Sequence, residues 1–251
     1  MPPRIYLQCH MGAAGDMLTA ALYELLNPED QKSFCQLMNQ KELDISVIPE
    51  SVNSQGISGT RIHVSIHGEE EHVHEYTHEH AHEHSSLNDI YQIIDHYPIQ
   101  DSVKEQAKQI YQNIANAESQ IHGKTVSEIH FHEVGMKDAI ADIIHVCWIL
   151  SCLQPEEIVV SEINVGHGTF HCAHGIMPVP APATALLLKN APIYSDDTPG
   201  ELCTPTGAAL LQYFHSSYSN LPKMKIHKIG YGIGSKKFQN PNFVRAFLYE
   251  V

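Results

Sequence analysis

The chain has 251 residues, enough for one large domain or two small ones, and 43% of them are hydrophobic, as in an ordinary globular protein. Its 15 basic and 29 acidic residues give a net charge of −14 with histidine neutral, which suits cations and argues against nucleic acid as the main partner. No apolar run reaches the roughly 18 residues needed to span a bilayer and no signal peptide opens the chain, so we expect a cytoplasmic protein without a membrane partner.

The first predicted elements are a strand, a turn and a helix. Residues 5–9 read as a buried strand that enters the small-residue turn of residues 10–15, and a helix then runs from Asp16 to about Leu26. This arrangement is a common place for a site in an α/β fold, and Asp16 is either a helix N-cap or a carboxylate presented at the start of the helix. Two strands of a hairpin follow, at residues 43–52 and 57–66.

A histidine-rich tract comes next, with eight histidines between His63 and His84 and six interleaved glutamates. Imidazole is a preferred ligand for nickel, copper and zinc, and the carboxylates raise the local concentration of cations. Because the tract has no apolar periodicity, we interpret residues 67–86 as a long disordered loop that binds metal; the alternative is a solvated polar linker. The metal ligands assigned to it are His67, His72, His74, His78, His80, His82 and His84.

The rest of the chain alternates between helical and extended patterns. This alternation predicts an α/β or α+β fold, with a mixed sheet and flanking helices. The expected helices are 87–96, 101–121, 138–153, a segment from Pro182 to about Lys189 and a short helix after Pro205. The expected extended segments are 125–132, 158–165, 224–233 and 243–249.

A second group of polar residues lies at the start of the helix 138–153. On an extended segment His130 and His132 point to the same side, and Glu133 follows them. On a helix, Asp138 and Asp142 share a face with His145, although His145 by itself fits a core histidine better. The group predicts an ordered metal or metal–phosphate site; the alternative is that the two histidines are hydrogen-bonded near the surface and Asp138 caps the helix.

A third group lies in the glycine-rich segment that contains His167, His171 and His174. Metal binding and anion binding by backbone amides with His174 are both open readings of this segment. The turn with Thr204 and Thr206 opens a helix whose N–H groups are suited to a phosphate, and ordinary capping by either threonine is the equal alternative.

Other sequence patterns exclude several chemistries. Residues 230–234 read G-Y-G-I-G, but no helix is expected after them, so a bulged strand or turn explains them better than a nucleotide loop. The chain has no G-x-S-x-G, no Walker loop and no H-E-x-x-H, so hydrolysis through a covalent intermediate is not supported. The six cysteines are scattered, with no C-x-x-C pair to form a thiol metal site.

Taken together, these motifs resemble the LarC family of nickel insertion proteins over essentially the whole chain. The matching segments are G-x-x-G-D-M at 12–17, the histidine tract, H-F-H-E-V-G-x-x-D at 130–138, A-H-G-x-x-P-V-P-A-P at 173–182, E-L-x-T-P-T-G-A at 201–208, G-Y-G-x-G at 230–234 and P-N-x-x-R at 241–245. The first segment departs from the family pattern, because Gln8, His10, Met11 and Ala14 replace an aspartate, a phenylalanine and two serines.

The resemblance implies a nickel chelatase, an enzyme of the lyase class that inserts Ni²⁺ into a thiolated pyridinium mononucleotide during lactate racemase maturation. It also implies CTP with Mg²⁺ or Mn²⁺. Members of the family are longer, so we expect residues 1–251 to be the N-terminal nickel-insertion region, which needs a C-terminal CTP-binding domain or partner chain that it lacks. We also expect a homo-oligomer.

The resemblance assigns residues to roles. A catalytic group would comprise His130, His132, Glu133, Asp138 and Asp142, and a cofactor-binding group Gly12, Gly15, Asp16, His174, Thr204 and Thr206. Two other functions remain open: a nickel storage or delivery chaperone, for which the histidine tract alone would suffice, and a metal-dependent hydrolase that uses His130, Asp138 and Asp142.

Overall fold

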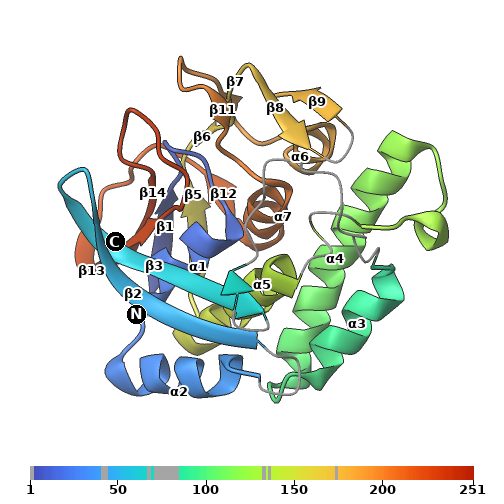
Figure 1. The fold of residues 1–251 in the computed structure, drawn as a ribbon. Helices are drawn as coiled ribbons and strands as arrows, with labels where there is room; N and C mark the ends of the chain where they lie inside the picture. Colours follow the sequence, from blue (N-terminus) through green and yellow to red (C-terminus); the bar gives the residue numbers. More distant parts are fainter. Residues whose placement is uncertain are drawn as a thin grey trace.

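A mixed β-sheet forms the centre of the protein, with helices packed on one side of it (Figure 1). The computed structural model describes residues 3–40, 45–66, 69–70, 85–131, 134, 137–172 and 175–251, and for residues 69–70 only the backbone. The seven tract histidines assigned as metal ligands and three of the residues expected in the ordered sites, His132, Glu133 and His174, lie outside these ranges.

Most strands belong to the large sheet, whose order is β12-β5-β1-β14-β13-β3-β2, with β4 paired to β3. β1 runs parallel to β5 and antiparallel to β14, so the sheet is mixed, as expected. Its strands are β1 (Arg4–Gln8), β2 (Ile45–Ser54), β3 (Ile57–Ile66), β4 (Glu69–Glu70), β5 (Glu157–Val160), β12 (Ser217–Tyr218), β13 (Lys225–Ile233) and β14 (Phe243–Glu250). Three two-stranded ladders lie outside it, formed by β6 (Ile163–Asn164) with β10 (Ile193–Tyr194), β7 (Gly166–His167) with β11 (Gly200–Glu201), and β8 (Thr169–Cys172) with β9 (Gly175–Pro178).

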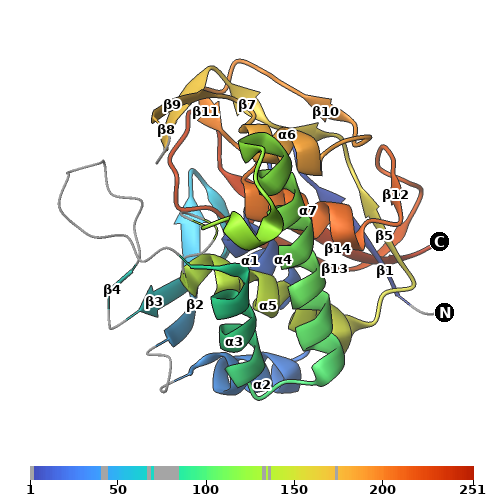
Figure 2. The same cartoon turned by 90° about the vertical axis from the view of Figure 1, so that its right-hand side faces the viewer.

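The helices pack together as a layer, and α4 runs along this layer from one end to the other (Figure 2). They are α1 (Gly15–Tyr23), α2 (Pro28–Met38), α3 (Leu87–His96), α4 (Asp101–His122), α5 (Lys137–Leu153), α6 (Pro182–Leu187) and α7 (Pro205–Phe214). α1 contacts both β13 and α5, and α5 contacts α4, so α1 and α5 occupy the middle of the core. Residues 140–150 of α5 are buried except for the partly buried Asp142, which explains why this helix is apolar almost all round.

The glycines of the G-Y-G-I-G segment are packing positions in β13. A Cβ at Gly230 would lie 2.0 Å from the carbonyl oxygen of Ala21, and one at Gly232 would lie 1.9 Å from that of Met17. Only glycine lets α1 approach the strand this closely. The segment is strand rather than a nucleotide loop, as expected, but residues 230–233 pair in regular register with β14, and the irregularity of β13 lies earlier, between Ile226 and Lys228.

Three local expectations were wrong or incomplete. The segment 125–132 is not extended throughout, because Val126–Glu128 forms a 3₁₀ turn closed by a capping box between Thr125 and Glu128. The first helix ends at Tyr23 rather than Leu26. The sequence reading also missed α2, whose Asn27 side chain accepts a hydrogen bond from the Asp30 N–H and whose first residue is proline.

Candidate active site

The loop after β1 carries the first cofactor-binding candidates to the start of α7. The Ala13 N–H donates to the Leu202 carbonyl at 3.1 Å, and the Thr204 N–H donates to the Ala13 carbonyl at 3.0 Å. Gly12 has a φ of +76°, and a Cβ there would lie 2.1 Å from the Leu202 oxygen. The glycine is therefore required for close packing between two backbone segments.

Three aspartates meet where α1 and α5 begin. A Cβ at Gly15 would lie 2.7 Å from the Asp142 Oδ2, so the helix start lies directly against this carboxyl. Burial raises the pKa of Asp142 well above its usual value, and the neighbouring charges of Asp16 and Asp138 raise it further, whereas the Asp16 backbone N–H opposes them. Asp142 Oδ1 has no hydrogen-bond partner among the described residues.

Asp16 shares this environment but has compensating charges. Burial raises the pKa of Asp16, while a hydrogen bond from the Met17 N–H at 2.8 Å and the positive charges of Arg61 and Lys236 lower it. Like-charged carboxyl groups this close do not ionise independently, so Asp16 and Asp142 behave as one coupled acid pair. Such a pair is suited to holding one proton or to ligating a cation.

Two buried tyrosines from neighbouring helical segments lie beside Asp142. The Tyr111 hydroxyl donates to the Val134 carbonyl at 3.1 Å, and the Tyr97 hydroxyl has no partner within the described part of the chain. Burial, followed by the negative charge of nearby aspartates, raises the pKa of both phenols, so both stay protonated. Neither tyrosine was predicted as a site residue, because their helical spacing reads as ordinary core.

His130 lies beside a different acid. The Phe131 N–H donates to the Ser85 carbonyl at 2.9 Å, which ties this segment to the start of α3. Two hydrogen bonds from Ser86 lower the pKa of Asp89, and the nearby His130 adds to the shift. Among the described residues, no three His, Cys, Asp or Glu side chains lie close enough together to hold a metal ion. The metal site that joins His130 to Asp138 and Asp142 therefore stays a prediction.

The remaining candidates on described residues have ordinary surroundings. The Gly207 N–H donates to Thr204 Oγ1 at 3.2 Å, and the Thr204 and Thr206 hydroxyls lie 3.0 Å apart, which is the geometry of N-capping. His167 and His171 are exposed on β7 and β8. His145 is fully buried in the core, as expected, and its ring meets Phe34 edge to face.

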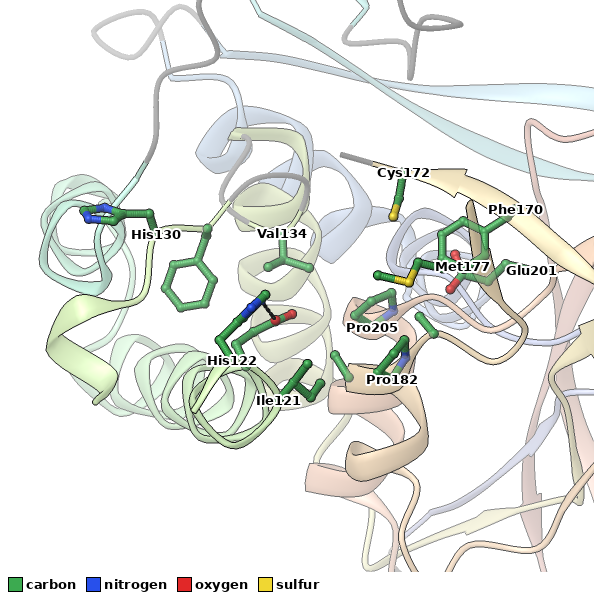
Figure 3. Close-up of a pocket in the computed structure, with 14 residues that line it drawn as sticks. Ile121, His122, His130, Val134, Phe170, Cys172, Met177, Pro182, Glu201 and Pro205 are labelled. Carbon is green, nitrogen blue, oxygen red and sulfur yellow. Dashed lines mark ion pairs between the residues drawn. The ribbon is translucent and has the colours of Figure 1, made fainter. Parts of the chain in front are cut away.

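A pocket of about 100 Å³ opens between the end of α4, the β8–β9 hairpin and the starts of α6 and α7 (Figure 3). Glu201, Cys172 and Phe170 lie on one side of it, and His130 lies at the opposite edge (Figure 3). His122 Nε2 lies 3.4 Å from a Glu118 carboxylate oxygen within the lining. The residues that line it are Glu118, Ile121, His122, His130, Phe131, Val134, Phe170, Cys172, Met177, Ala181, Pro182, Ala183, Glu201 and Pro205.

The pocket and the aspartates are neighbours. Val134 lines the pocket and accepts the Tyr111 hydrogen bond, while Tyr111 in turn lies near Asp138 and Asp142. Pro205 also lines the pocket, and it follows Thr204 in the chain. The Thr204 N–H donates to the carbonyl of Ala13, in the loop that leads to Asp16. Val134 and Tyr111 therefore connect the lining of the pocket to the aspartates.

Comparisons with known proteins agree with this arrangement of motifs. A protein-family model described as "Nickel insertion protein" matches residues 5–251. Relatives named pyridinium-3,5-bisthiocarboxylic acid mononucleotide nickel insertion protein include one from Staphylococcus epidermidis, 39% identical over the whole chain and 60% of the relative, and one from Clostridium kluyveri, 41% identical over 98% of this chain and 62% of the relative. No solved structure gives a significant match.

The chain spans about 60% of the length of the curated relatives it matches. None of the helices described here is long and apolar enough to cross a membrane.

Proposed function

Because the chain belongs to the nickel insertion protein family, we propose that it inserts nickel into pyridinium-3,5-bisthiocarboxylic acid mononucleotide, as a chelatase of the lyase class. The observation that carries this proposal is the family match across residues 5–251, which includes every motif around the acid pair and the pocket. Here nickel is the cargo, and the thiolated mononucleotide is the acceptor.

The acid pair supports a role in proton transfer. Nickel displaces protons from its ligands when it binds, so insertion needs an acceptor for them. A carboxyl group whose pKa is raised by burial and by a second carboxylate takes up a proton nearer neutral pH than an ordinary aspartate does. We therefore assign proton acceptance to Asp16 and Asp142, with Asp138 as the third acid that raises the pKa of the pair.

Nickel delivery is assigned to the histidines. His67, His72, His74, His78, His80, His82 and His84 would collect the metal, because imidazole competes well for nickel. His130, His132, Glu133 and Asp138 would receive it, and the two thiocarboxylate groups of the acceptor supply soft ligands. The chain itself then needs no paired cysteines.

CTP does not fit the start of α1. Asp142 lies against this helix start, so a triphosphate there would meet the carboxyl groups of Asp16 and Asp142. At the start of α7 the Thr204 hydroxyl already accepts a hydrogen bond from the Gly207 N–H. We therefore place CTP and its Mg²⁺ or Mn²⁺ outside Gly12–Asp16 and Thr204–Thr206, in a C-terminal domain or partner chain, and we propose lactate racemase maturation as the use of the product.

The test is nickel transfer to the bisthiolated mononucleotide in the presence of CTP, with and without the C-terminal portion of a relative. We expect nickel-containing product, measured by mass spectrometry, only when that portion is present. Tight nickel binding without product in either case would contradict the proposal and would indicate a storage protein. Turnover of an unrelated substrate without any thiolated pyridinium compound would indicate the hydrolase.

A further inference from the structure

The size of the pocket suits one aromatic ring. An apolar cavity of about 150 Å³ binds a benzene molecule, and this pocket measures about 100 Å³ with an open mouth. A single six-membered ring fits the enclosed part, and a whole mononucleotide does not. The ribose and phosphate of a bound mononucleotide would therefore extend through the mouth of the pocket.

The pocket has one wall suited to a ring that carries a positive charge. Glu201 is only 8% exposed, and it lines the pocket on the same side as Phe170 and Met177 (Figure 3). A carboxylate in a poorly hydrated wall attracts a cation more strongly than one in water does. An aromatic face beside it adds attraction for a delocalised organic cation, as in sites for quaternary ammonium groups.

We propose that this pocket binds the pyridinium ring of the acceptor, with Glu201, Phe170 and Met177 along one face of the positively charged ring and the ring nitrogen towards the mouth. This inference rests on the proposed function and adds the position and orientation of the substrate. A ring nitrogen bonded to ribose keeps its positive charge at every pH. The complementary group in the wall therefore has to be an anion, and among Glu201, Phe170 and Met177 only Glu201 supplies one.

The orientation follows from the geometry of the ring. Positions 3 and 5 flank the carbon opposite the nitrogen, so a nitrogen whose ribose leaves through the mouth directs both thiocarboxylate groups away from the mouth. Val134 lies on the other side of the pocket, and the Tyr111 that is bonded to it lies near Asp138 and Asp142 (Figure 3).

The subsite is tested by calorimetric titration with two ligands. One is nicotinic acid mononucleotide, whose ring is a pyridinium, and the other is its 1,4-dihydropyridine form, whose ring is uncharged. We expect the wild-type chain to bind the charged ring about tenfold more tightly than the neutral one, and Glu201→Gln to remove that preference. Glu118→Gln is the matched control, because Glu118 lines the pocket from α4 and not from the wall of Glu201, Phe170 and Met177; it should change affinity less than about twofold. Phe170→Leu should weaken binding of the charged ring several-fold.

The two levels of the proposal can fail separately. Glu201→Gln keeps the shape of the side chain, and unchanged thermal unfolding would show that the variant is folded. If the wild-type chain, supplied with its C-terminal portion, inserts nickel but Glu201→Gln binds both ring forms as wild type does, the subsite is wrong and the function stands. If the wild-type chain does not bind the pyridinium mononucleotides and does not insert nickel, both the subsite and the proposed function are wrong.

Discussion

At the scale of single residues, the Asp142 carboxyl has the least favourable surroundings in the candidate site. It is the third acid beside Asp16 and Asp138, and its Oδ1 is unpartnered within the described structure. The raised pKa means that the folded protein binds this proton more tightly than the unfolded chain does. Its stabilising effect is therefore complete below pH 3.8, the usual pKa of aspartate, and is lost as the pH rises through the raised value.

We predict that Asp142→Asn stabilises the protein above neutral pH while abolishing nickel insertion. Removing the charge should raise the free energy of unfolding at pH 8 by about 1 kcal/mol or more, which is about 2–4 °C in Tm for a chain of this size. Thermal unfolding from pH 5 to pH 8 measures it, with the exposed Asp197→Asn as control. A destabilised Asp142→Asn at pH 8 would mean that the carboxylate is satisfied in the fold.

His145 gives the opposite dependence on pH. Burial lowers the pKa of His145 from 6.5 to about 3, and neither ring nitrogen has a partner in the described part of the chain. The unfolded chain therefore gains this proton first, and stability falls as the pH falls from 6.5 towards 3, by about 1.4 kcal/mol per unit. We predict that His145→Leu removes most of this slope in urea unfolding between pH 6.5 and 4.5. An unchanged slope would place the acid sensitivity elsewhere.

At the scale of elements, the contact between α7 and the loop before α1 depends on a helical glycine. Alanine is the better helix former by about 1 kcal/mol, but a Cβ at Gly207 would lie 2.2 Å from the Ala13 carbonyl oxygen. Backbone overlap of this size outweighs the propensity, so we predict that Gly207→Ala lowers stability by about 1–3 kcal/mol. Denaturant unfolding measures it, with the exposed Ser102→Ala of α4 as control. A more stable Gly207→Ala protein would show that the two segments separate easily.

The sequence predicted best those elements that carry both periodicity and end signals. Residues 87–96 are a helix over the whole expected range, with Ser86 and Asp89 forming the capping box at its start. The strand expected at 158–165 instead ends at Val160, where the Ser161 hydroxyl accepts a hydrogen bond from the Cys9 N–H. A contact between residues so far apart in the chain leaves no local pattern to read.

The candidate site was predictable only in part for the same reason. The spacing of Asp138 and Asp142 placed both on one helix face, and the start of α1 was predicted to present Asp16. That these faces meet follows from tertiary packing through Gly15, which no local pattern shows. From the sequence, Tyr97 and Tyr111 had no predicted role, and Glu201 was only the first residue of a family motif. Their proximity to the aspartates and the pocket depends on how the helices pack.

At the scale of the whole molecule, the described fold supplies an acid pair, an adjacent pocket and no complete metal site among its described residues. In the proposed function, nickel would be bound with the help of residues outside those ranges, of the substrate, or of a partner. The histidine tract is the strongest source of ligands in the sequence, and the thiolated acceptor supplies two more. This division separates a chelatase from a storage protein, because only the chelatase needs the pocket.

The most direct measurement is the rate of nickel insertion by the chain lacking residues 67–84, supplied with CTP and the C-terminal portion of a relative, at scarce and at saturating nickel. We predict that the deletion lowers the insertion rate about tenfold or more when nickel is scarce and leaves it within about twofold of wild type at saturating nickel. The reason is that the tract collects metal and does not perform the insertion. Complete loss at saturating nickel would contradict it, and would mean that the tract itself is the insertion site.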